Sequence, residues 1–300
     1  MPTPPRPPGP GDARLPRRIA WLLTAVALGT ACVIAAAHPA RAQAPSPPPQ
    51  KDLLLPGEVF AVDGHTAFLF TPEAGEPLPA ASAKPWILYA PTLPAYPDEA
   101  ERWMHDRFTK AGVAVAGIDT GESYGSPDAV RATEKLHAEM VKRGYAARPA
   151  VLGRSRGGLW ASAWAIAHPE WTAGIGGIYP VYDWRTYPGV DNAAGAYGLA
   201  PAELVARAHD LCPIERIAVA AKAGVPVCII HGDMDTVVPL EPNSGRLEAS
   251  YRAAGKGDLV RLIVARGQGH NFWEGFFRCQ ELVDFLVAQS RAGAAESTSR

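Results

Sequence analysis

Short apolar runs alternate with longer amphipathic segments from residue 57 onward. GEVFAV and HTAFLFT flank Asp63-Gly64, a dipeptide typical of a tight hairpin turn, and they predict two paired strands. Later runs are apolar almost throughout, which is typical of strands buried on both faces of a parallel sheet. They are WILYA, VAVAGI, AVLG, AGIGGIY, VPVCIIHG and LVRLIVA.

Segments with helical periodicity separate these runs. The clearest spans residues 126–144, where Ser126 stands at the N-cap position and Pro127 in the first turn. The alternation predicts an α/β fold, a mainly parallel sheet with helices on both faces. The other predicted helices are 98–112, 158–168, one near Glu248 and 281–289.

Residues 180–216 interrupt this rhythm. They are rich in Tyr, Trp, Pro and Gly, and they lie between two predicted strands. We expect a small lid insertion over the carboxyl edge of the sheet, where open α/β sheets bind ligands. Aromatic side chains in this segment or directly before it are candidates for stacking on a sugar or an acyl group, or for packing the lid itself: Tyr179, Tyr182, Trp184, Tyr187 and Tyr197.

The strongest chemical motif is Gly153-Arg154-Ser155-Arg156-Gly157, between a predicted strand and a predicted helix. A G-x-S-x-G sequence in this context is typical of a sharp turn that exposes a nucleophilic serine. The helix amino terminus aims N–H groups at the reacting carbonyl, so the Arg156 amide is a natural oxyanion donor. The second match, around Ser123, lies several residues past its strand, and we interpret it as a structural loop.

Carboxylates and a histidine follow the serine in chain order. In HGDMDTVVP, Asp233 and Asp235 both stand at a strand end and are both candidate acids. His270, in GQGHNFW, is the only histidine after them, and it follows a predicted strand directly. It is therefore the candidate general base, while His231 is more simply explained as structural.

These three segments resemble the α/β-hydrolases over about residues 57–290. HGDMDTVVP is similar to the H-G-x-x-D-x-x-V-P motif of that superfamily, which implies that Asp235 is the triad acid and Asp233 a turn residue. The resemblance implies an α/β-hydrolase fold and a Ser155-His270-Asp235 triad. The serine and HGD segments also resemble the prolyl oligopeptidase family.

The second oxyanion donor is expected in the loop after WILYA, which lacks the HGGG motif of lipases. The end of that strand points to the Leu93 backbone N–H, with Thr92 next. Arg154 and Arg156 flank the nucleophile, and each has two interpretations. One of them pairs with an anionic substrate group, or both bind carboxylates at the sheet edge.

The amino terminus accounts for much of the unusual composition. Twelve of the 30 prolines lie within the first 50 residues, around an uncharged apolar stretch at 19–37 that follows Arg17 and Arg18. This arrangement predicts an export signal at 1–42, cleaved near Ala42 or Ala44, and fits a twin-arginine signal only loosely. An uncleaved membrane anchor is the alternative. A lipoprotein site at Cys32 is disfavoured by Gly29.

Removing residues 1–42 changes the net charge of the chain and defines the mature protein. The formal net charge of −1 becomes −1 − 4 = −5, which argues against nucleic-acid binding. We expect a Pro-rich linker at 43–56, a hydrolase domain at 57–290 and a flexible tail at 291–300. The exported protein is expected in the periplasm or outside the cell, with no membrane contact after cleavage.

Three cysteines remain after cleavage. Cys228 lies in an apolar run and is predicted to be buried, while Cys212 and Cys279 are candidates for a disulfide. The sequence contains no H-E-x-x-H, no C-x-x-C and no nucleotide-binding glycine motif, so we expect neither a metal nor a cofactor.

The expected function is therefore that of an exported serine hydrolase. A carboxylic ester is the first candidate substrate, including acyl groups on a carbohydrate or polysaccharide. A prolyl oligopeptidase-like peptidase is the enzymatic alternative. A hydrolase fold kept as a non-catalytic binding protein is a third hypothesis, disfavoured because all three triad residues are present.

Overall fold

The computed structural model describes residues 49–73 and 83–297. The predicted export signal, Cys32, the alternative anchor and the first part of the predicted linker lie outside these residues. Within the described part of the chain, no helix combines the length and the apolar character needed to cross a bilayer.

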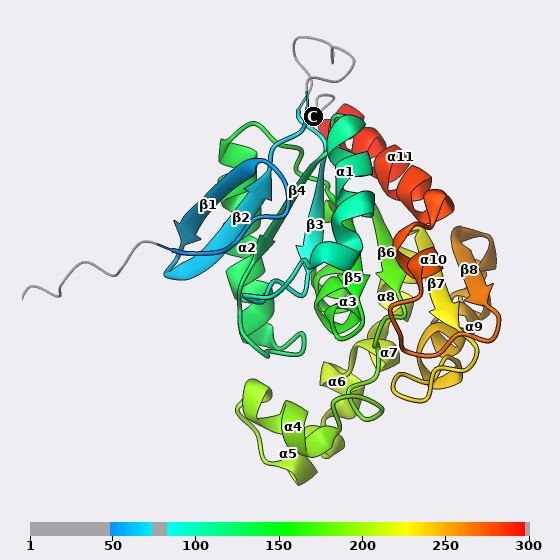
Figure 1. The fold of residues 1–300 in the computed structure, drawn as a ribbon. Coiled ribbons are helices and arrows are strands. Elements are labelled where there is room, and N and C mark those ends of the chain that lie inside the picture. Colours follow the sequence, from blue (N-terminus) through cyan, green and yellow to red (C-terminus); the bar gives the residue numbers. More distant parts are fainter. Residues whose placement is uncertain (1–48, 74–82, 298–300) are drawn as a thin grey trace, which may run out of the picture. The chain divides into compact units, whose positions relative to one another are not determined.

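The core of the fold is an eight-stranded sheet in the order β1-β2-β4-β3-β5-β6-β7-β8 (Figure 1). β2 pairs antiparallel with both β1 and β4, and every other pairing is parallel. This confirms the predicted mainly parallel α/β-hydrolase fold. The strands are β1 Gly57–Val62, β2 His65–Phe70, β3 Trp86–Ala90, β4 Ala114–Ile118, β5 Ala150–Arg154, β6 Gly174–Ile178, β7 Val227–Gly232 and β8 Val260–Ala265.

Local sequence explains the strands well. Asp63 and Gly64 both have positive φ, 51° and 83°, as a two-residue hairpin turn between β1 and β2 requires. Five of the six apolar runs became β3 to β7, in which every residue is buried. The sixth became β8, which is only partly buried, contrary to the prediction, because it lies at the edge of the sheet. Both faces of the central sheet are therefore covered.

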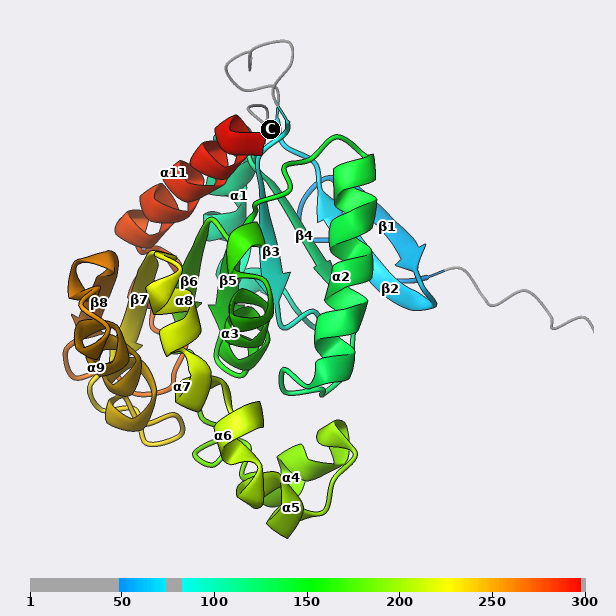
Figure 2. The same ribbon diagram turned by 180° about the vertical axis from the view of Figure 1, so that it is seen from behind.

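Helices form the two covering layers. Figure 1 shows α1 and α11 in front of the sheet, and Figure 2 shows α2, α3 and α8 on the opposite face. The α-helices are α1 Arg102–Lys110, α2 Pro127–Lys142, α3 Gly157–Ala167, α4 Val190–Ala194, α5 Pro201–Ala206, α6 Ala208–Leu211, α7 Pro213–Arg216, α8 Ala218–Lys222, α9 Arg246–Ala253, α10 Glu274–Phe277 and α11 Gln280–Ser297. Shorter 3-10 segments are Glu99–Glu101, Pro169–Trp171, Gly195–Tyr197 and Gly257–Leu259, and a π-helical turn spans Glu241–Gly245.

Two helix ends differ from expectation. Ser126 is the N-cap residue of α2 and Pro127 begins the helix, but the buried Ser126 hydroxyl makes no capping hydrogen bond. α11 continues to Ser297, so residues 291–297, expected within a flexible tail, are helical. Its Ala294 is buried against the core, which explains why the helix does not stop at residue 290.

The interruption at 180–216 is a chain of short helices, α4 to α7. Figure 1 shows them beyond the carboxyl ends of the strands, at the edge where the insertion was expected. The three cysteines in the described residues are all free thiols, so the candidate disulfide between Cys212 and Cys279 is not formed. Cys212 packs in the cluster beneath the insertion, whereas Cys279 packs against the cluster below α11.

Candidate active site

The G-x-S-x-G segment forms the turn that its sequence predicts. β5 ends at Arg154 and α3 begins at Gly157, which leaves Ser155 at the tip with a φ of 49°. This left-handed conformation is costly for a residue other than glycine. Backbone hydrogen bonds hold it, from Ser155 N to Ile178 O (2.9 Å) and from Val181 N to Ser155 O (2.8 Å).

The two flanking glycines are required by close backbone contacts. A Cβ on Gly153 would lie 2.8 Å from the carbonyl oxygen of Gly157. A Cβ on Gly157 would lie 2.1 Å from the carbonyl oxygen of Ala90, at the end of β3. Both contacts would be with backbone carbonyl oxygens, which cannot move aside as the end of a flexible side chain can. The turn therefore admits only glycine at these positions without a shift of the sheet or helix.

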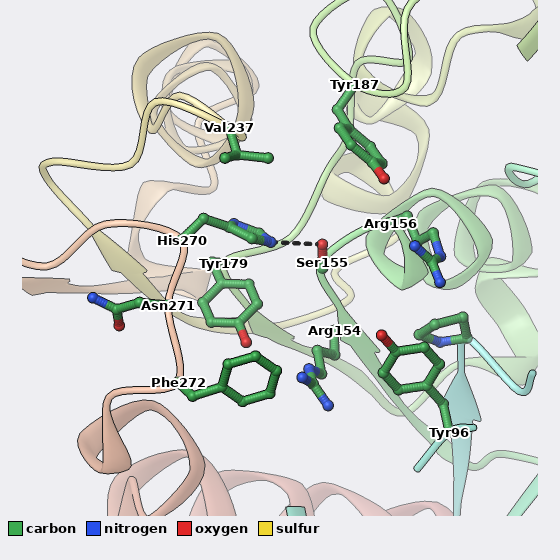
Figure 3. A pocket seen from close by; sticks show the side chains of 11 residues that line it. Tyr96, Arg154, Ser155, Arg156, Tyr179, Tyr187, Val237, His270, Asn271 and Phe272 are labelled. Atoms are coloured by element: carbon green, nitrogen blue, oxygen red, sulfur yellow. Dashed lines mark hydrogen bonds between the residues drawn. The ribbon is translucent and has the colours of Figure 1, made fainter. Parts of the chain in front are cut away.

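The structure brings the three predicted triad side chains into one hydrogen-bonded series. Ser155 Oγ lies 2.9 Å from His270 Nε2, the contact drawn in Figure 3. His270 Nδ1 lies 2.7 Å from Asp235 Oδ2. Ser155 follows β5, Asp235 follows β7 and His270 follows β8, so three parallel strands deliver the three groups to one edge.

Asp235 is buried and held as an anion. Its Oδ1 accepts hydrogen bonds from the backbone N–H groups of Val237 (3.0 Å) and Val238 (2.7 Å). Burial opposes the charge, but the hydrogen bonds from His231, His270 and Val238 keep the pKa of Asp235 well below its ordinary value. The carboxylate is thus ready to accept the His270 Nδ1–H and to orient the ring.

The neighbouring candidates have structural contacts. His231 is fully buried between Ser244 Oγ (2.7 Å) and the Val238 carbonyl (2.8 Å), where it fixes the loop that carries Asp235. Asp233 accepts from the Gly267 N–H at 2.6 Å and so ties this turn to the loop before His270. Ser123 bonds Thr120 Oγ1 at 2.8 Å and lines a different cavity from Ser155.

A cavity of about 220 Å³ opens beside Ser155 and His270. Figure 3 shows Val237 and Phe272 on the His270 side, and Arg156 and Tyr96 on the other. Phe272 is 69% exposed, and it follows the base in GHNFW, a position that could have drawn attention in the sequence. The lining residues are Pro91, Tyr96, Arg154, Ser155, Arg156, Tyr179, Tyr187, Val237, His270, Asn271 and Phe272.

Neither Leu93 nor Thr92 lines this cavity. The Leu93 carbonyl accepts from Lys51 Nζ at 2.6 Å, and the Thr92 hydroxyl donates to the Tyr89 carbonyl. Pro91 does line the cavity but carries no N–H. The oxyanion donors at Leu93 and at the Arg156 amide both stay predictions, and Arg156 lies at the cavity as its role needs.

The aromatic side chains of the insertion divide into two groups. Tyr182 and Trp184 are buried in the core beneath the insertion, and the Tyr197 hydroxyl donates to the Tyr124 carbonyl, so these three pack the structure. Tyr179 and Tyr187 line the cavity. Tyr179 also packs on His270, with ring centroids 4.3 Å apart.

Arg154 is occupied by carboxylates. Its Nη1 lies 2.7 Å from Glu101 Oε2 and 2.9 Å from Asp98 Oδ2, and the Tyr89 hydroxyl donates to Glu101 as well. Burial disfavours the charge, but the Glu101 carboxylate raises the pKa of Arg154. The sequence did not single out Glu101 or Asp98, which lie within the helix predicted at 98–112. No group of three or more candidate metal ligands occurs among the described residues.

Comparison with known protein families identifies the family of the segment that carries this site. Residues 120–289, which contain Ser155, Asp235 and His270, match the Prolyl oligopeptidase family. The chain belongs to this family. It is therefore a serine hydrolase of the α/β-hydrolase superfamily, as the resemblance of its motifs implied. A search of curated proteins gave no match.

Solved structures share the fold of this family member at low identity. A puromycin hydrolase aligns with a TM-score of 0.60 and 20% identity, over 79% of this chain and 39% of that one. A Mycobacterium tuberculosis puromycin-hydrolyzing peptidase gives 0.61 and 18%, over 79% and 39%. Est1E from Butyrivibrio proteoclasticus gives 0.58 and 18%, over 79% and 99%. The chain thus spans about two fifths of the length of the first two proteins.

Proposed function

We propose that this serine hydrolase cleaves carboxylic esters through an acyl-enzyme formed on Ser155. The observation that carries the proposal is the continuous hydrogen-bonded series from Ser155 through His270 to buried Asp235, which opens onto a cavity. This arrangement activates a hydroxyl for attack on a carbonyl carbon.

The reaction follows from the contacts. His270 Nε2 accepts the Ser155 proton as Oγ attacks the carbonyl, and the electron pair of the broken π bond moves to the carbonyl oxygen. The Arg156 N–H donates to this oxyanion. The intermediate collapses, the bond to the alcohol oxygen breaks, and His270 returns the proton to the leaving alcohol. Water then repeats the sequence and releases the acid from Ser155.

The form of the cavity supports a small ester. A volume of about 220 Å³ suits a short acyl group, and Val237 and Phe272 give the His270 side an apolar surface for the leaving alcohol. A short acyl group esterified to a carbohydrate hydroxyl is one substrate of this kind. Tyr187 is then the insertion residue placed to contact it, rather than the buried Tyr182 or Trp184.

A peptidase is the second candidate, and the family match favours it. A puromycin hydrolase also shares this fold. The chemistry would differ only in the leaving group, an amine in place of an alcohol, with the same proton delivery from His270.

One substrate panel separates the two candidates. Purified protein is assayed with p-nitrophenyl acetate and butyrate and with aminoacyl p-nitroanilides, and kcat/KM is compared. We expect ester turnover that exceeds anilide turnover, and a loss of at least about 10⁴-fold in Ser155→Ala. Faster turnover of the anilides than of the esters would establish the peptidase instead.

We also propose export, on the basis of the sequence at residues 1–42. The test is the intact mass of the chain recovered from the periplasm or medium of a bacterial host. A mature chain that begins near residue 43 or 45 supports the proposal. An uncleaved chain in the membrane fraction would show the alternative, a tether.

A further inference from the structure

The two arginines beside the nucleophile have different surroundings. Arg154 is bound by two carboxylates that do not themselves line the cavity. Arg156 lines the cavity with about a fifth of its side chain exposed, and its Nη2 forms an ion pair with half-exposed Glu122 at 3.2 Å. Of the two interpretations drawn from sequence, carboxylate binding at the sheet edge thus describes Arg154 fully and Arg156 only in part.

Arg156 keeps donors free for a ligand. A guanidinium has five N–H donors, and the Glu122 contact is made by one nitrogen. Its Nε is buried and has no hydrogen-bond partner among the described residues. The Tyr96 ring lies 5.4 Å from the Arg156 Cζ to its centroid, which is within the range of a cation–π contact. A buried donor of this kind is costly until an acceptor reaches it.

The cavity around Arg156 is suited to an anion. Its lining in the described part of the chain includes Arg154 and Arg156 but no aspartate or glutamate. Asp98 and Glu101 already balance the charge of Arg154. Glu122 contacts Arg156 through Nη2, so Arg156 is the lining cation with donors left for an anion. A carboxylate is the acceptor that fits a planar guanidinium best, because two oxygens take two parallel N–H bonds.

The side on which Arg156 lies determines which half of the substrate carries the charge. Figure 3 shows Arg156 on the side of Ser155 opposite to His270. His270 delivers the proton to the leaving alcohol, so the alcohol leaves on the His270 side. A group that reaches Arg156 therefore belongs to the acyl half.

We propose that Arg156 selects substrates whose acyl group carries a carboxylate, that is, half-esters of short dicarboxylic acids. This rests on the proposed ester hydrolysis. The carboxylate of the acyl chain accepts hydrogen bonds from the Arg156 guanidinium, while the ester carbonyl lies at Ser155 Oγ.

The test uses esters that differ only in charge. Monomethyl glutarate is compared with methyl glutaramate, its neutral amide analogue, by acid release in a pH-stat. We expect the ratio of kcat/KM values, charged to neutral, to be at least about tenfold, as a charge-assisted hydrogen bond supplies. The acetate esters of 4-hydroxybutanoate and 4-hydroxybutanamide carry the same difference in the alcohol half, and there we expect a ratio near one.

Variants assign the preference to the side chain. Arg156→Gln removes the guanidinium and retains the backbone N–H, so the glutarate ratio is expected to fall to about one, and Arg156→Lys to restore part of it. Arg266→Gln is the matched control, because Arg266 is highly exposed and outside the cavity lining but carries the same charge. We expect it to keep the wild-type ratio.

The outcomes separate this inference from the proposed function. Hydrolysis of both glutaryl esters with a ratio near one, or an equal ratio in Arg156→Gln, overturns the inference and leaves ester hydrolysis standing. If neither glutaryl ester is hydrolysed although p-nitrophenyl acetate is, the inference is overturned and ester hydrolysis stands. If p-nitrophenyl acetate is not hydrolysed either, the proposed function fails, and the inference that rests on it fails with it.

Discussion

The Arg154 guanidinium donates to the buried carboxylate of Glu101 at 2.7 Å, beneath the turn that carries Ser155. The two residues are 53 positions apart, and the ion pair links the 3-10 segment that precedes α1 to the end of β5. Burial, together with the nearby Asp98 charge, raises the pKa of Glu101, while Arg154 and the Tyr89 hydroxyl stabilise the charged form. The buried carboxylate therefore depends on these two partners.

Loss of the Glu101 charge should therefore destabilise the fold. Glu101→Gln leaves the buried Arg154 charge with Asp98 alone, and we expect the free energy of unfolding to fall by about 3 kcal/mol. Urea denaturation measures it. Glu99→Gln is the matched control, since the Glu99 ion pair with Arg102 is exposed and is worth about 0.5 kcal/mol or less. Equal effects of the two variants would contradict the role given to Glu101.

The nucleophile turn should not tolerate a methyl group at Gly157. Gly157→Ala places a Cβ against the Ala90 carbonyl, so we expect a fall of at least about 100-fold in kcat/KM or failure to fold, read by ester assay and circular dichroism. Gly195→Ala is the control, because no atom lies within 4 Å of its Cβ position and its φ is −58°. Near-normal activity of Gly157→Ala would show that the turn is looser than described.

Sequence patterns predicted the parts of the site that depend on local geometry. Ser155 was found because a strand, a tight turn and a helix follow each other within a few residues. The Glu101 contact with Arg154 depends instead on β3 lying beside β5, which the order of elements along the chain does not reveal. Likewise, no periodicity in the insertion distinguishes Tyr187, which faces the cavity, from buried Tyr182.

His105 should make stability sensitive to mild acid. Its ring is fully buried among Phe70, Tyr89 and Phe108, and neither nitrogen has a hydrogen-bond partner among the described residues. Burial, assisted by the charge of Arg154, lowers the pKa of His105 to about 3, against 6.5 in the unfolded chain. The unfolded state thus binds the extra proton, so stability is complete above pH 6.5 and declines as the pH falls toward 3.

At pH 5 this difference amounts to about 2 kcal/mol, from about 1.4 kcal/mol per pH unit. We expect His105→Leu to lose that much of the pH dependence between pH 7 and 5, measured by urea unfolding. The exposed His209→Gln should retain it. An unchanged pH dependence in His105→Leu would show that another group titrates.

Asp235 should act through the His270 tautomer. Asp235→Asn presents an amide to His270 Nδ1 and no longer favours a proton there, so we expect kcat to fall by about 10³- to 10⁴-fold with a smaller change in KM. The ester assay measures both constants. Asp233→Asn is the matched control, since Asp233 contacts the Gly267 N–H rather than the base, and its kcat should stay within about tenfold of wild type.

The most direct test of the account is the site of covalent labelling by a fluorophosphonate. Wild-type protein and Ser123→Ala, which alters the other G-x-S-x-G match, are expected to be labelled on Ser155, as located by peptide mass spectrometry. Ser155→Ala is expected to remain unlabelled. Labelling of Ser155→Ala, or a label found on Ser123 in the wild type, would contradict the assignment of Ser155 as the nucleophile.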